Sequence, residues 1–120
     1  MSVKGMAIAI GLAALAACSD AVIKQGETAK LRLEEGESRT VNDIRISVSD
    51  FTDAIVAGEG GMMSEYTRFT LTLSQGGLNI TEEARYGSAF TNFGYILRVK
   101  DCATGTRDWK SFCEIEVGKQ

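Results

Sequence analysis

The chain has 120 residues, of which 13 are basic and 16 acidic, and it contains neither histidine nor proline. The absence of histidine excludes Ser-His-Asp and Cys-His nucleophile systems and any acid–base step through imidazole. The charges are interspersed and form no basic patch, which argues against a nucleic-acid partner.

The first 17 residues have the pattern of an export signal. Lys4 gives a cationic start, and an uninterrupted run of apolar and small residues follows from 6 to 17. This run is about 12 residues long, whereas a helix that spans a bilayer needs about 20. We therefore predict a signal helix over 1–17 that is cleaved from an exported protein.

The end of this run resembles the lipobox of bacterial lipoproteins. The residues that carry the resemblance are Leu15-Ala16-Ala17-Cys18. The resemblance implies cleavage before Cys18 and acylation of that cysteine, palmitate included, so that a covalent lipid is the only cofactor and the membrane is the first partner. It places the protein in the bacterial cell envelope. In a Gram-negative cell, Ser19 resembles outer-membrane sorting, with the protein facing the periplasm or the surface. An ordinary signal peptide with a chance cysteine is the alternative.

The rest of the chain has room for one domain. Residues 18–27 are short and polar, which predicts a lipidated tether, although Val22 and Ile23 can also dock as a first edge strand. Residues 28–120 then form a single folded unit, because about 100 residues suffice for one core and not for two.

Alternation of apolar and polar residues predicts short strands along this domain. The alternating runs cover 29–34, 44–49 and 68–73, a shorter partner covers 78–81, and a last hairpin pairs 95–100 with 113–117 around a turn at 103–107. Six or seven strands in about 100 residues predict an all-β fold, either a small antiparallel β-sandwich (immunoglobulin-like or related) or a small β-barrel. A mixed α+β domain is the alternative, with 81–85 as the best helical candidate.

Two cysteines remain once Cys18 is assigned to lipid. Cys102 and Cys113 lie in an exported chain, where a disulfide is the default state of a cysteine pair. It would close a loop of about a dozen residues and contribute about 3 kcal/mol. A metal site is the alternative, but it needs two further ligands that the spacing does not offer, so no metal is predicted.

Carboxylates are the remaining candidates for catalysis. Asp50 and Asp53 lie beside an expected strand end, and Glu82-Glu83 lie in an expected loop. A carboxylate pair can cleave a glycosidic bond, but acidic residues in such positions more often cap turns. We assign no catalytic residue and predict a non-catalytic binding or structural accessory module whose partner is an envelope protein.

Two segments are candidates for binding that partner. Residues 57–65 read as a flexible, glycine-rich loop with adaptable Met62 and Met63, or as a loose connection whose methionines fold back onto the core. Residues 84–95 are the part of the chain richest in aromatic residues, and they form either a recognition patch or core filling. The candidate binding residues in this second segment are Arg85, Tyr86, Phe90 and Phe93.

The second segment also resembles part of the membrane-bound lysozyme inhibitors. Ala84-Arg85-Tyr86, downstream of 71–76, carries this resemblance. Those proteins are small bacterial lipoproteins with a β-barrel, in which a Ser-Gly-Ala-Arg-Tyr-like loop enters the lysozyme cleft. The chain departs from them in Glu82-Glu83, which stand where small residues are expected. The resemblance implies periplasmic lysozyme inhibition as an alternative function, and an assembly or pilot lipoprotein of a secretion or envelope complex is a second alternative.

Overall fold

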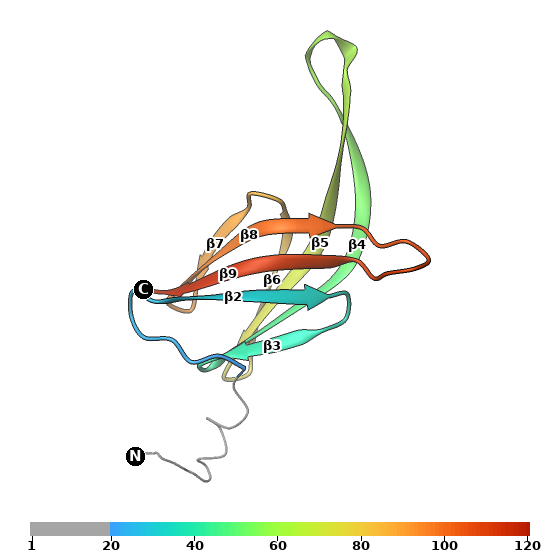
Figure 1. Ribbon diagram of the computed structural model, residues 1–120. Helices are drawn as coiled ribbons and strands as arrows, with labels where there is room; N and C mark the ends of the chain where they lie inside the picture. The colour runs from blue at the N-terminus through green and yellow to red at the C-terminus, as the bar shows by residue number, and fades with distance from the viewer. Residues whose placement is uncertain (1–19) are drawn as a thin grey trace, which may run out of the picture.

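The protein is a β-sandwich of two four-stranded sheets (Figure 1). The computed structural model describes residues 20–120, so Cys18 and the predicted signal helix over 1–17 lie outside the described residues. Neighbouring strands of both sheets pair antiparallel. The prediction of a small antiparallel sandwich is therefore confirmed, and the barrel and the mixed α+β domain are not observed.

Each sheet is assembled from strands that are far apart in the sequence. One sheet has the order β2-β9-β8-β7, and the other has the order β3-β4-β5-β6. The strands are β2 (Thr28–Glu34), β3 (Ser38–Val41), β4 (Ile44–Ala57), β5 (Met63–Gln75), β6 (Leu78–Arg85), β7 (Ala89–Asn92), β8 (Tyr95–Ala103) and β9 (Phe112–Lys119). The short strands β3 and β7 were not predicted, and the β8–β9 connection runs over 104–111 rather than 103–107.

Strand β6 corrects two expectations. Residues 81–85, the helical candidate, and Glu82-Glu83, expected in a loop, both lie within this strand and pair with β5. The turn before β6 explains the difference. Gly76 and Gly77 both have positive φ (56° and 88°), as a tight two-residue hairpin turn requires. Because this turn fixes the register, the polar residues that follow continue as a strand.

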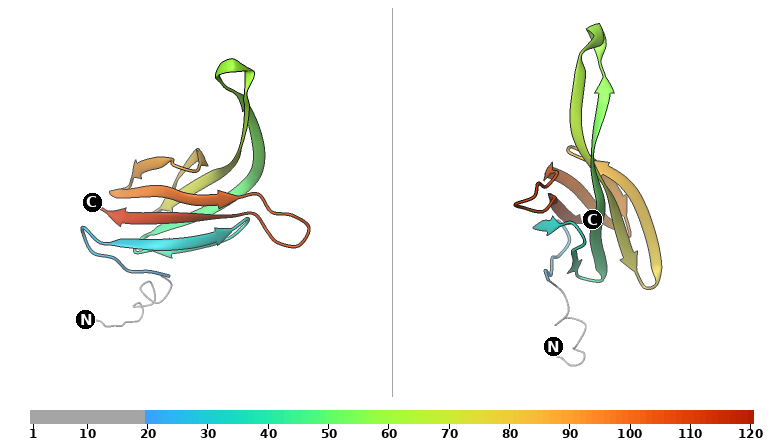
Figure 2. Two further views of the ribbon diagram at one scale, coloured as in Figure 1. Left: turned by 45° about the horizontal axis from the view of Figure 1, so that its top comes forward. Right: turned by 90° about the vertical axis from the view of Figure 1, so that its right-hand side faces the viewer.

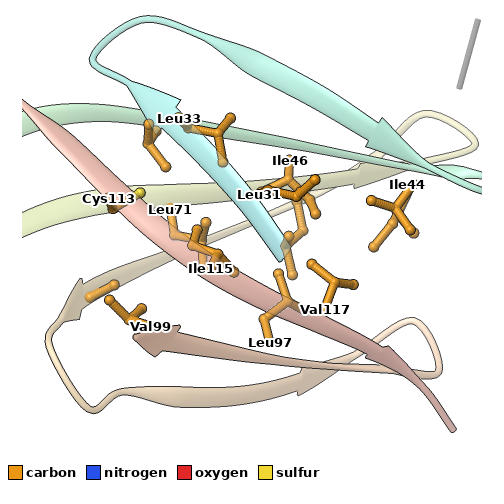
Figure 3. Close-up of a cluster of buried hydrophobic side chains, with 14 of the residues drawn as sticks. Leu31, Leu33, Ile44, Ile46, Leu71, Leu97, Val99, Cys113, Ile115 and Val117 are labelled. Atoms are coloured by element: carbon orange, nitrogen blue, oxygen red, sulfur yellow. The ribbon is translucent and has the colours of Figure 1, made fainter. Parts of the chain in front are cut away.

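The core lies between the two sheets (Figure 3). Alternate side chains of each strand point inward and interdigitate with those of the opposite sheet, while the intervening residues face outward. The fully buried side chains include Leu33, Ile44, Ile46, Leu71, Leu97, Ile115 and Val117. The period-two pattern of the sequence therefore places the apolar residues of both sheets in one common core.

Residues 20–27, expected as a tether, lie along the sandwich. Ile23 is buried, its amide donates to Oδ1 of Asn42 (2.9 Å), and its carbonyl accepts from Nδ2 of Asn42 (2.9 Å). The amide of Asp20 donates to the carbonyl of Thr40 (2.7 Å). Val22 is exposed, so Ile23 provides the apolar docking contact. Among residues 20–120, no helix is long and apolar enough to cross a membrane.

Strands β4 and β5 continue beyond the sandwich as a two-stranded ribbon (Figures 1 and 2). Their pairing runs on to Ala57 and Met63, whereas β3 pairs with β4 only as far as Ser47 and β6 pairs with β5 only as far as Arg68. We call residues 52–67 the arm. The tip of the arm lies at the opposite end of β4 from the turn that joins β3 to β4.

Candidate functional site: the arm and its foot

The foot of the arm is attached to the sandwich by aromatic and polar contacts. A β-bulge interrupts the pairing between Ser49 and Thr52 and turns Phe51 inward, where it stacks on Phe69 with ring centroids 4.9 Å apart. The carboxylate of Asp53 accepts hydrogen bonds from the hydroxyls of Thr67 and Thr104. Since Thr104 belongs to the β8–β9 connection, these bonds link the arm to the opposite sheet.

Strand geometry gives the arm two different faces. Alternate residues of a strand share a face, and so do direct antiparallel partners. Because Phe51 and Phe69 point into the core, the residues at two-residue intervals beyond them lie on the same side. We call this set the arm face: Asp53, Ile55, Ala57, Met63, Glu65 and Thr67. The arm face prolongs the core-facing side of the sheet past the end of the sandwich, where the opposite sheet no longer covers it (Figure 2).

Large apolar side chains are concentrated and exposed on the arm. The exposed fractions are 63% for Ile55, 48% for Val56, 73% for Met62 and 65% for Met63. Met62 and Met63 therefore do not fold back onto the core. Apolar surface gathered on a projecting element is typical of interaction sites, whereas single exposed apolar residues are common everywhere on protein surfaces.

The expected flexible loop over 57–65 is shorter than predicted, because both of its ends are strand. β4 ends at Ala57 and β5 begins at Met63, so only residues 58–62 connect them, with a short 3-10 turn over Glu59–Gly61. Pairing extends this far because each residue of one strand finds a backbone partner on the other. Ile55 and Val56 were not predicted as binding residues. Their only signal was the non-alternating apolar run 54–57, which a half-buried strand does not show.

The charged residues between 46 and 67, a range that includes the arm, are all acidic. No lysine or arginine occurs between Arg45 and Arg68. The acidic residues in that interval are Asp50, Asp53, Glu59 and Glu65. The charge of the whole chain is mixed, and for this reason composition alone did not reveal the segregation.

The aromatic segment 84–95 is divided between core and surface. Phe90 and Phe93 are partly buried and pack against the core, which confirms the core-filling alternative for these two residues. Tyr86 is 70% exposed, and Arg85 is also exposed. The guanidinium of Arg85 lies over the ring of Tyr66, 4.9 Å from its centroid, at the foot of the arm and on the side opposite to the arm face.

The structure does not bring the two predicted binding segments together. Met63 is at the tip of the arm, whereas Arg85 pairs with Arg68 at its foot. Met63 and Arg68 are five positions apart along β5, which corresponds to about 17 Å. The methionines and the Arg85–Tyr86 pair are therefore separate surfaces.

Cys102 and Cys113 are direct partners on β8 and β9. Cys113 is fully buried, Cys102 is partly buried, and both are free thiols in the structure. Direct antiparallel partners have Cβ atoms about 4.5–5.5 Å apart, against about 3.8 Å in a disulfide, so closing the bond requires only a small approach of the strands. The disulfide stays a prediction, supported by this pairing.

The two thiols are expected to differ in reactivity when the protein is reduced. Burial raises the pKa of Cys113 to about 12, and burial also raises the pKa of Cys102. Thiolate is the reactive form. In reduced, folded protein at pH 8 we expect iodoacetamide to label Cys102 slowly and Cys113 not at all, as measured by mass spectrometry of peptides. Labelling of both after unfolding is the control, and equal labelling of both in the folded state would contradict the burial of Cys113.

The candidate carboxylates Asp50 and Asp53 lie at the foot of the arm. Asp53 is engaged with two hydroxyls, and Asp50 lies at the bulge with a φ of 55°. Among residues 20–120, no group of three or more potential ligands is placed to hold a metal ion. Neither family models, curated proteins nor solved structures give a match to the chain. Its function must therefore be argued from the arm itself.

Proposed function

We propose that the chain is a lipid-anchored envelope protein that acts as a non-catalytic binding module and contacts a protein partner through the arm. One observation carries this proposal: an apolar ribbon projects from a sandwich whose core is already complete. No strand of residues 20–120 pairs with either edge of the ribbon, and its apolar side chains are exposed. Unpaired strand edges and exposed apolar surfaces promote aggregation of an isolated protein unless a partner covers them.

The position of the predicted lipid supports an outward-pointing arm. Cys18 precedes Asp20 by two positions in the sequence, and two extended residues span at most about 7 Å. Asp20 is hydrogen-bonded to Thr40 at the end of the sandwich away from the arm. Acyl chains on Cys18 would therefore hold that end against the bilayer, with the arm directed away from the membrane.

Site-specific crosslinking in cells tests the role of the arm. A photo-reactive amino acid at Met63 is expected to crosslink one protein partner, identified by mass spectrometry, and the yield is expected to fall severalfold when Ile55→Ser is added. The same probe at Leu78 is the matched control, because Leu78 is equally exposed (66%) but lies at the β5–β6 turn. Crosslinks of equal yield and identity at both positions, or none at Met63, would refute a specific role of the arm. A partner that belongs to a secretion or envelope complex would favour an assembly or pilot lipoprotein.

The exposure of Arg85 and Tyr86 favours lysozyme inhibition as a second candidate. Both side chains are accessible at the end of β6, as a residue pair that enters an enzyme cleft must be. Purified protein titrated against lysozyme would then inhibit it, and Arg85→Ala with Tyr86→Ala would abolish the inhibition. No inhibition at micromolar excess over the enzyme would remove this candidate and leave the arm proposal intact.

A further inference from the structure

The arm face combines an uncovered apolar stripe with charges of a single sign. Ile55, Ala57 and Met63 form its apolar part, since Ala57 and Met63 are direct partners and Ile55 is diagonal to Met63. Glu65 lies beside them as the direct partner of Ile55, and Glu59 lies at the tip. Residues 46–67 contain no lysine or arginine that could balance these carboxylates.

We propose that the arm face binds an extended segment of a cationic protein, in which apolar and basic side chains follow each other at two-residue intervals on one face of the segment. This inference rests on the proposed function of the arm and specifies its partner. An extended segment fits because the arm offers strand edges that no strand of residues 20–120 pairs with, so that the ligand can add as a further strand. The two-residue interval follows from β5, where Met63 and Glu65 lie two residues apart on the arm face. A strand added along β5 would place an apolar side chain beside Met63 and a lysine or arginine beside Glu65.

The charges argue against two other occupants. If the arms of two copies packed together, six carboxylates from two arms would meet without any basic residue of the arms between them, and such like-charge contacts are destabilising. An anionic bilayer surface would be repelled in the same way. A cationic segment would instead be attracted, and the negative electrostatic potential of the arm would also speed its association.

Binding of defined peptides to the processed full-length protein in a non-ionic detergent tests this inference. The probe is a labelled eight-residue peptide of sequence Val-Thr-Lys-Thr-Val-Thr-Lys-Thr, in which valine and lysine follow each other on one face of a strand, and the counter-probe has glutamate in place of lysine. We expect fluorescence anisotropy to show binding of the lysine probe at least about tenfold tighter than that of the counter-probe, with weakening as NaCl rises from about 0.05 M to about 0.5 M.

Three double variants distinguish binding to the arm from general charge attraction. Glu59→Gln with Glu65→Gln is expected to lower the affinity for the lysine probe about tenfold, because charge pairs at an interface strengthen binding and speed association. Asp108→Asn with Glu114→Gln removes the same charge from exposed positions off the arm and is expected to change the affinity less than about twofold. Ile55→Ser with Met63→Ser is expected to weaken the lysine probe about tenfold by removing buried apolar contact.

Several outcomes would overturn the inference. They are equal binding of the two peptides, equal losses from the two pairs of charge variants, or no loss from Ile55→Ser with Met63→Ser. Concentration-dependent dimerisation that these serine variants abolish would assign the arm face to a second copy, and arm-dependent binding to neutral phosphatidylcholine vesicles would assign it to lipid. If crosslinking at Met63 identifies a partner but the lysine probe does not bind, only the cationic chemistry is wrong. If crosslinking fails, the proposed function itself is wrong.

Discussion

Phe69→Ala is expected to lower the free energy of unfolding by about 3–5 kcal/mol, the range observed for removal of a buried aromatic ring. Phe69 is 1% exposed, is the largest fully buried side chain of the described core, and stacks on Phe51 at the foot of the arm. Its removal leaves a cavity that the two sheets cannot close without shifting the arm. A domain of this size has about 5–15 kcal/mol of stability in total, so this single substitution removes a large fraction of it.

Urea denaturation followed by circular dichroism measures this effect. Leu78→Ala is the matched control, because Leu78 is also a large apolar residue of the same sheet but is 66% exposed. We expect its free energy of unfolding to change by less than about 0.5 kcal/mol. A loss below about 1 kcal/mol for Phe69→Ala would mean that the foot of the arm is not packed as described, because even modest core truncations exceed this.

Cys18→Ser is expected to move the protein from the membrane fraction to the soluble fraction. A single myristoyl-length chain gives only marginal binding, with an association constant of about 10⁴ M⁻¹, and stable anchoring takes a second chain or signal. Lipidation at Cys18 would supply several chains at once, and serine cannot carry the thioether that the resemblance implies. Phase partitioning in Triton X-114 and fractionation of cells measure the change.

Two controls separate lipidation from other causes of membrane association. Ser19→Ala retains the lipidated cysteine and is expected to stay in the detergent phase. Cys102→Ser removes a thiol of the folded domain and is expected to stay there too. If the Cys18→Ser protein still enters the detergent phase, the lipoprotein interpretation is wrong and the membrane contact lies elsewhere in the chain.

The strands that the sequence predicted well are those whose signal is local. Residues 29–34 and 44–49 alternate because one side of each strand faces the core, and Leu33 and Ile46 are both fully buried. Strand β6 was predicted only in part. Its later residues are polar on the outer face and carry little apolar signal, so their strand conformation depends on pairing with β5. Pairing between segments is a non-local property that local alternation does not report.

In the candidate site, too, the sequence predicted local features and missed those that depend on neighbouring strands. Met62 and Met63 were both predicted to lie in a loop. Met62 does lie in the connection between β4 and β5, whereas Met63 begins β5 and pairs with Ala57. Ile55 was not singled out, because an apolar residue after an alternating run looks like one more core position. Its exposure follows from where β3 and β6 stop and where the opposite sheet ends.

Composition and period-two alternation were enough to predict a small all-β domain without histidine chemistry, and a short N-terminal motif predicts lipidation at Cys18. These signals are local, so they can be read from the sequence alone. The extension of β4 and β5 beyond β3 and β6, and the common uncovered face of Ile55, Met63 and Glu65, became apparent only in the folded chain. Exposure of these side chains depends on the lengths of the strands packed alongside, and those lengths are set by contacts between distant parts of the chain.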